Sequence, residues 1–154
     1  MKKKTILIID GQGGRLGVLL TERMKVALPD FSITAVGTNT IATAAMLRAG
    51  ADHGATGEYP VICAAEHAAY IAGPVGIAIP ASLTGEVTPA MAEAVGRSPA
   101  EKILIPGDKC AIHIVGTQKL TLGEYADMAV KRILELEAAE NANKKGEREL
   151  CTKN

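Results

Sequence analysis

The sequence has no tryptophan and a single phenylalanine, and aromatic residues make up only 3% of its 154 residues. Hydrophobic residues nevertheless reach 47%, which excludes a globally disordered chain. The expected core is therefore aliphatic and rich in alanine, as it is where helices pack closely on a parallel sheet. The length is that of one domain with a core of ordinary size.

An excess of charge of one sign is also lacking, since 17 Lys and Arg residues are balanced by 17 Asp and Glu residues. Binding along a nucleic acid requires a basic surplus on one face, so we expect no nucleic-acid partner. No apolar run approaches the roughly 20 residues that cross a bilayer, and the run at 5–9 is too short for a signal sequence. Three cysteines, an odd number, fit a reducing compartment. We expect a cytoplasmic protein with no membrane partner.

Several catalytic motifs are missing. No Gly-Lys-Ser/Thr follows the glycine-rich turn, no Gly-x-Ser-x-Gly occurs, and Tyr125 has no lysine four residues later. Cys63 with His67 and Cys110 with His113 have metal-like spacing. The third predicted strand, which holds Cys63, and the fifth, which precedes Cys110, would lie about 19 Å apart at about 4.8 Å per strand, too far to share one ion. We predict no metal site, and thiol or metal chemistry at Cys63 and Cys110 stays a weaker hypothesis.

Strand and helix patterns alternate along the chain. The predicted strands cover residues 5–9, 32–36, 60–64, 102–105 and 111–115, and within 70–79 a further strand, the fourth in chain order, runs into a shaped loop because Gly73, Pro74 and Gly76 break the apolar run. The predicted helices run from the glycine-rich turn to 28, over 40–49 and 89–95, and from 121 to about 138. This alternation predicts a three-layer, Rossmann-like α/β domain. Its mainly parallel sheet would have five to six strands in the order 3-2-1-4-5. We assign residues 1–138 to this domain and expect 139–154 to form a polar, frayed tail.

Two of the predicted helices carry very little charge. Residues 40–49 and 89–95 are rich in Ala and Met and hold one charged residue each, Arg48 and Glu93. A helix with so little polar surface is typically buried on more than one side. We therefore expect a homo-oligomer.

The turn between the first strand and the first helix reads GQGGRLG over residues 11–17. Glycines allow the backbone to approach a ligand closely, and a helix N-terminus offers unpaired N–H groups and partial positive charge to a phosphate. The pattern predicts binding of a nucleotide or another phosphate-bearing small molecule. A tight turn without a ligand is the alternative.

The match to a dinucleotide-binding fingerprint is incomplete. The third glycine falls one residue late, at Gly17, because Leu16 stands in its place. No acidic residue for a ribose hydroxyl follows the second strand, and the nearest arginine, Arg48, lies at the far end of the next helix. The cofactor is therefore unassigned, with NAD(P) as one possibility and another nucleotide as a second.

Ligands of such sheets bind beyond the carboxyl ends of the strands, where the strand order reverses. Asp10 could contact a ligand there or could accept N–H bonds from the turn. Residues 38–40 could face the same crevice or could simply cap the next helix. The loops after the fourth predicted strand could complete a polar pocket. The candidate ligand-binding residues are Asp10, Gly11, Gln12, Gly13, Gly14, Thr38, Asn39, Thr40, Gly73, Pro74, Gly76 and Glu86.

The function predicted from these residues is binding of a phosphate-bearing small molecule, by an oxidoreductase, a transferase or a protein without catalysis. No catalytic residue can be assigned. The second hypothesis is a non-enzymatic sensor or an oligomeric assembly subunit with the same fold.

Six segments together resemble a known family. They are residues 8–14, 35–39, 49–58, 73–77, 85–91 and 102–106. Over residues 4–136 the chain is similar to the bacterial domain-of-unknown-function family 3842. The resemblance implies a cytoplasmic bacterial setting, and it brings no established activity and no catalytic residues.

Overall fold

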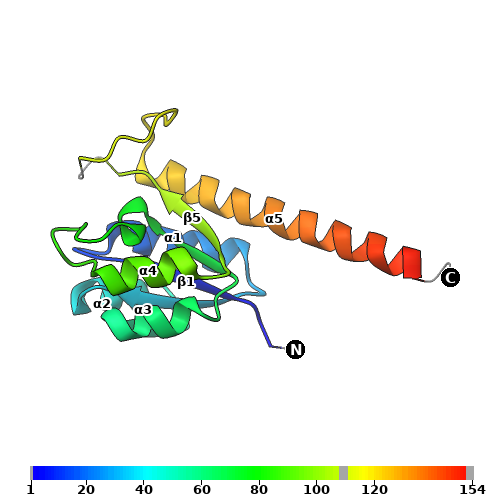
Figure 1. The fold of residues 1–154 in the computed structure, drawn as a ribbon, viewed down its shortest axis with the longest axis horizontal. Helices are drawn as coiled ribbons and strands as arrows, with labels where there is room; N and C mark the ends of the chain where they lie inside the picture. The colour runs from blue at the N-terminus through cyan, green and yellow to red at the C-terminus, as the bar shows by residue number, and fades with distance from the viewer. Residues whose placement is uncertain (1, 108–110, 152–154) are drawn as a thin grey trace.

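The computed structural model describes residues 2–107 and 111–151. Strands and helices alternate along the described residues (Figure 1). In order they are β1 (Thr5–Asp10), α1 (Arg15–Ala27), β2 (Ser32–Gly37), α2 (Thr40–Arg48), β3 (His53–Thr56), α3 (Glu58–Ala65), β4 (Tyr70–Pro74), the 3-10 helix η1 (Val75–Ala78), α4 (Pro89–Arg97), β5 (Glu101–Ile105) and α5 (Leu122–Cys151).

The sheet confirms the predicted fold class and strand order. Its five strands in the described residues are all parallel, in the order β3-β2-β1-β4-β5. The central strand is β1, where Ile8 pairs with Ala35 on one side and with Ala72 on the other. Because β2 and β4 follow β1 on opposite sides, the strand order reverses between β1 and β4.

Helices cover both faces of the sheet. Ile6 and Ile8 of β1 are fully buried on the face covered by α1, α2 and α5, whereas Leu7 and Ile9 are buried on the face covered by α3 and α4. This alternation follows from the two-residue period of a strand. Both cores are largely aliphatic, as the scarcity of aromatic residues predicted. Phe31 and Tyr70 form an edge-to-face pair in the first core.

The third predicted strand, at 60–64, is wrong. That segment belongs to helix α3, and the third strand is β3, four residues with mostly exposed side chains at the edge of the sheet. Gly57, with φ of 103°, turns the chain from β3 into α3. Pro60 is compatible with the first turn of a helix, where a missing N–H costs nothing. A short apolar run such as 61–64 fits a helix as well as a strand.

The fourth strand runs into a shaped segment, as predicted: it ends at Pro74 and η1 follows it, because Pro74 and Gly76 interrupt the extended chain. No sixth strand forms at 111–115: these residues belong to the loop between β5 and α5. Val115 is 98% exposed in this loop, so this apolar residue does not mark a buried strand.

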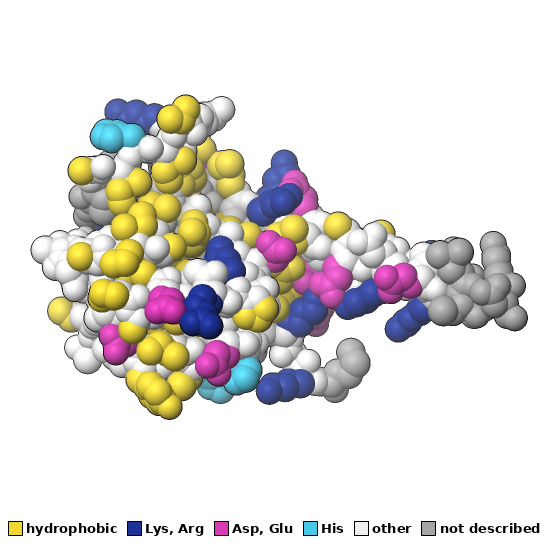
Figure 2. All heavy atoms as spheres, in the orientation of Figure 1, with side chains coloured by type: hydrophobic (Ala, Val, Ile, Leu, Met, Phe, Trp, Pro, Cys, Tyr) yellow, Lys and Arg dark blue, Asp and Glu magenta, His cyan; other side chains and the backbone are white. Residues whose placement is uncertain are grey.

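The last helix is longer than the sequence predicted. Where a frayed tail is expected from residue 139, α5 continues to Cys151 and extends beyond the sheet (Figure 1). Alanines favour helix there, and Lys144 pairs with Glu140 one turn away. Lys4 also binds Glu137 and Glu140, both at 2.8 Å, and so links α5 to the residue before β1. Lysine, arginine and acidic side chains lie next to one another along α5 in Figure 2.

Within the described part of the chain, none of the helices combines the length and the apolar character that crossing a membrane requires.

Candidate ligand-binding site

The glycine-rich turn is a tight connection from β1 to α1. Gln12 and Gly14 take left-handed conformations, with φ of 50° and 73°, and the N–H of Gly14 donates to the carbonyl of Gly11 at 2.9 Å. A side chain at position 14 would press on the backbone of Ala42 in α2. A side chain at position 17 would collide with Met46. These glycines therefore allow α1 to pack closely against α2.

Three backbone N–H groups of this region are bound by the chain's own carboxylates. Asp10, only 6% exposed, accepts from the N–H of Gly11 at 2.8 Å and of Gly17 at 2.7 Å. Glu86 accepts from the N–H of Gln12 at 2.8 Å. Asp10 thus has the structural role that the sequence analysis considered as one of two alternatives. Asp10 also lines the cleft that lies beside the turn.

The remaining N–H groups of the turn have no acceptor among the described residues. They belong to Gly13, Arg15 and Leu16, at and just before the first turn of α1. Gly13 and Arg15 are exposed. Unpaired amides at a helix N-terminus carry partial positive charge, which favours an anion.

A cleft of about 380 Å³ lies beside these amides, at the carboxyl ends of β1 and β4. The residues from 10 to 16 line one side, and the segment after β4 lines another. The start of the loop after β5 and the first residue of α5 complete it. The lining residues are Asp10, Gly11, Gln12, Gly13, Gly14, Arg15, Leu16, Pro74, Val75, Gly76, Leu83, Pro106, Gly107 and Leu122.

A second group of predicted residues lies on the β2 side of the turn. Glu86 accepts hydrogen bonds from the hydroxyl of Thr38 and from the side-chain amide of Asn39, the latter at 3.2 Å. Asn39 also donates to the carbonyl of Gln12 at 2.9 Å and caps α2 by accepting from the N–H of Ala42. Burial raises the pKa of Glu86, but the hydrogen bonds from Thr38, Gln12 and Asn39 outweigh it and hold the pKa below its ordinary value.

A strained loop directs Glu86 towards the turn. Ala81, Leu83 and Thr84 all have positive φ, which is uncommon for residues with side chains. Backbone hydrogen bonds hold the loop, including Ala81 N–H to Val87 at 2.8 Å, and Ser82 donates to the carbonyl of Ile79 at 2.8 Å. Such conformations persist only where the surrounding structure imposes them, and they concentrate at functional sites.

The predicted site residues therefore divide into two sets. Residues 10–14, Pro74 and Gly76 line the cleft. Thr38, Asn39 and Glu86 bind one another and the turn and do not line the cleft, and Thr40 is exposed at the start of α2. Gly73 does not line it either: a side chain there would overlap the carbonyl oxygen of Ile9, so this glycine lets β4 approach β1.

Seven residues that line the cleft were not predicted from the sequence: Arg15, Leu16, Val75, Leu83, Pro106, Gly107 and Leu122. Arg15, Leu16, Val75 and Leu83 lie within or beside motifs that were recognised. Pro106, Gly107 and Leu122 come from the connection between β5 and α5, where only the folded chain brings the start of α5 to the turn.

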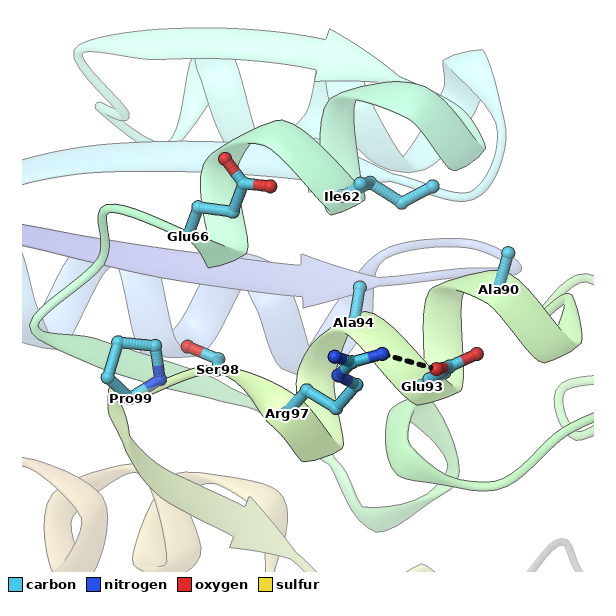
Figure 3. Close-up of a pocket in the computed structure, with 8 residues that line it drawn as sticks. All are labelled: Ile62, Glu66, Ala90, Glu93, Ala94, Arg97, Ser98 and Pro99. Carbon is cyan, nitrogen blue, oxygen red and sulfur yellow. Dashed lines mark hydrogen bonds and ion pairs between the residues drawn. The ribbon is translucent and has the colours of Figure 1, made fainter.

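A second hollow, of about 490 Å³, lies between α3 and α4 on the other face of the sheet (Figure 3). Its arginine, Arg97, is paired with Glu93 at 3.0 Å one helical turn away. It lies at neither the carboxyl edge of the sheet nor the start of α1, so the glycine-rich turn has no part in it. We place the candidate site at the first cleft.

No group of three potential metal ligands occurs among the residues described. Cys63 is exposed on α3 and not on a strand, contrary to the prediction, and Cys110 lies outside the described residues.

A parallel five-stranded sheet with a glycine-rich turn and a cleft at its reversal point defines a Rossmann-like α/β protein. The chain belongs to the family described as Domain of unknown function (DUF3842), whose model matches residues 5–138 and confirms the resemblance found in the sequence. Among solved structures it is similar to a dodecameric FMN-dependent Ubix-like decarboxylase from Escherichia coli O157:H7. That match has 17% identity and a TM-score of 0.44, and it covers 84% of this chain and 75% of the other. No curated protein matches the chain.

Proposed function

We propose that this protein binds a phosphate-bearing small molecule, with the phosphate on the amides at the start of α1. One observation carries the proposal: the N–H groups of Gly13, Arg15 and Leu16 have no acceptor among the described residues and belong to residues that line the cleft. The helix N-terminus attracts negative charge, and Arg15, one of the residues that line the cleft, carries a full positive charge.

The walls of the cleft suggest what the rest of the ligand resembles. Apart from the turn, they are formed mainly by apolar side chains, among them Pro74, Leu83 and Leu122. Binding sites for small molecules commonly combine apolar walls with a few convergent polar groups. The body of the ligand would therefore be an apolar or flat ring system, as in a nucleotide. We place this binding in the cytoplasm of a bacterium, and we assign no reaction to it.

The test is thermal unfolding of the purified protein with inorganic phosphate and with a panel of nucleotides. A ligand that binds the folded state raises the melting temperature with its concentration. Gly13→Val should remove this effect, because a side chain at position 13 would enter open space beside the amides without meeting an atom within 4 Å. The matched control is Gly96→Val, another glycine whose added side chain meets nothing, far along α4.

Two results would contradict the proposal. If no phosphate compound stabilises the protein, the cleft is not a phosphate site. If Gly13→Val keeps the full ligand effect, the ligand does not use these amides. Loss of the effect in both variants would point to general destabilisation, which the melting temperatures without ligand would reveal.

Self-association is a second candidate property, as the sequence predicted. Large apolar side chains lie exposed on both α2 and α3, among them Ile41 at 68% and Tyr59 at 74%. Light scattering coupled to gel filtration would measure the mass in solution, and Ile41→Glu should lower it if α2 forms the contact.

A further inference from the structure

We infer that the cleft takes a mononucleotide, with one phosphate and one ring system, and excludes dinucleotides such as NAD(P). The inference rests on the proposed function and narrows its ligand class. It follows from what occupies the two sides of the glycine-rich turn.

The β2 side of the turn is filled by Glu86. In dinucleotide-binding folds the second nucleotide lies over the end of the second strand, where an acidic residue of that strand binds its ribose. Here that strand end carries Thr38 and Asn39, and the carboxylate comes instead from the loop before α4. Glu86 lies against the turn itself, at 2.8 Å from the N–H of Gln12.

The packing at Gly11 indicates how little room remains there. A side chain at position 11 would overlap the carboxylate of Glu86 and the hydroxyl of Thr38, and would press on Leu83. The space next to Gly11 is therefore already filled by the side chains of Glu86, Thr38 and Leu83. A dinucleotide would therefore have to displace Glu86 from its three partners.

Charge opposes a second phosphate as well. The hydrogen bonds from Gln12, Thr38 and Asn39 favour the ionised carboxylate of Glu86, so a negative charge lies beside the turn. Like charges in a partly buried site repel strongly. On the cleft side the three unpaired amides lie close together in sequence, at 13, 15 and 16, which suits a single phosphate group.

The volume agrees with a small ligand. The cleft measures about 380 Å³, near the lower end of the roughly 300–1,000 Å³ found for small-molecule pockets. Its lining residues come from the turn, the segment after β4, Leu83, the start of the loop after β5 and the start of α5, and none of Thr38, Asn39 and Glu86 is among them. A cleft of this size suits one ring system with its phosphate, and the second half of a dinucleotide would have to lie outside these walls.

The test is calorimetric titration of the full chain with matched pairs of probes: AMP against NAD, and FMN against FAD. At least one mononucleotide should bind, and its matched dinucleotide should bind weaker by about tenfold or more. Glu86→Ala removes the carboxylate from the β2 side of the turn, so it should reduce the ratio of mononucleotide affinity to dinucleotide affinity. The control is Glu93→Ala, which removes one acidic residue of α4, paired with Arg97, without touching the turn.

The outcomes separate the two proposals. Binding of a dinucleotide as tightly as its mononucleotide overturns this inference and leaves the proposed function intact. Failure of all four probes and of inorganic phosphate to bind overturns the proposed function itself. If Glu86→Ala does not fold, the ratio measured on the unmodified protein still decides the inference.

Discussion

The Asp10 carboxylate accepts a hydrogen bond from the backbone N–H of Gly17 at 2.7 Å, and so the last residue of β1 holds the first turn of α1. The same carboxylate accepts from its neighbour, Gly11, at 2.8 Å. A negative charge at a helix N-terminus also stabilises the helix through the aligned peptide dipoles. One buried side chain thereby fixes the shape of the turn that borders the cleft.

Asp10→Asn should lower the free energy of unfolding by about 1.5–3 kcal/mol, the usual contribution of hydrogen bonds to a charged group. Asparagine keeps one acceptor oxygen, but its NH₂ group would face an N–H donor. Urea unfolding measures the loss. Asp30→Asn, at an exposed position, is the control and should change stability by less than about 0.5 kcal/mol. Equal stability of the two variants would mean that Asp10 does not hold the turn.

Most of the fold could be predicted because strand–helix alternation and right-handed crossovers allow few topologies. The strand order is confirmed although one strand was placed wrongly. That error has a physical cause: β3 is an edge strand of four residues with mostly exposed side chains, so its pattern is weak. The neighbouring residues of α3 are more apolar and more β-branched than β3 itself, and short apolar runs do not distinguish helix from strand.

The site could be predicted in part. The turn and Pro74 were identified because glycine and proline mark the ends of strands. The direction of Glu86 could not be predicted, since it depends on positive φ at Leu83 and Thr84, residues whose types give no sign of it. The contribution of Leu122 depends on where α5 begins in space, which no local pattern encodes.

Gly73→Ala should destabilise the protein by about 1–3 kcal/mol, the usual cost of overpacking. The added methyl group would overlap the carbonyl oxygen of Ile9, which is backbone and cannot rotate away. Strands β1 and β4 would have to separate next to the cleft. Gly96→Ala is the matched control: its methyl group meets nothing within 4 Å, and alanine should stabilise α4 by about 0.5–1 kcal/mol. If both variants shift the melting temperature in the same direction, the overlap with Ile9 does not explain the effect of Gly73→Ala.

Tyr70→Phe should loosen α5. The Tyr70 hydroxyl donates to Glu137 at 2.7 Å, beside the ion pair of Glu137 with Lys4. Removing it should cost about 1–2 kcal/mol and speed hydrogen exchange around residue 137. Tyr59→Phe is the control, because that ring is 74% exposed and should change stability by less than about 0.5 kcal/mol. If hydrogen exchange in α5 is unchanged in Tyr70→Phe, the ion pairs of Lys4 are sufficient to hold α5 in place without the tyrosine hydroxyl.

The same tyrosine gives a prediction at high pH. Burial, and then the hydrogen bond to Glu137, raise the pKa of Tyr70 above its ordinary value of 10.0. The unfolded chain therefore loses this proton at lower pH than the folded chain does, so stability should fall as pH rises above about 10. Tyr70→Phe should show a smaller fall over that range in urea unfolding.

Glu86→Gln should make the free energy of unfolding less dependent on pH under acidic conditions. Although burial raises the pKa of Glu86, its three hydrogen bonds lower it overall below the ordinary value of 4.5. The folded chain therefore holds this proton less tightly than the unfolded chain. The stability that Glu86 contributes is complete above pH 4.5 and is lost as pH falls through the lowered pKa.

At pH 7 the variant should be less stable by about 1–3 kcal/mol, because hydrogen bonds to a charged acceptor are replaced by weaker ones. As pH falls below 4.5 the difference from the unmodified protein should shrink, because Glu86 then becomes neutral in both states. Glu93→Gln is the control: it breaks an exposed pair with Arg97, worth less than about 1 kcal/mol. Urea unfolding from pH 7 to pH 3 measures all three proteins. A deficit in Glu86→Gln that stays constant over this range would mean that packing, and not the charge of Glu86, holds the loop on the turn.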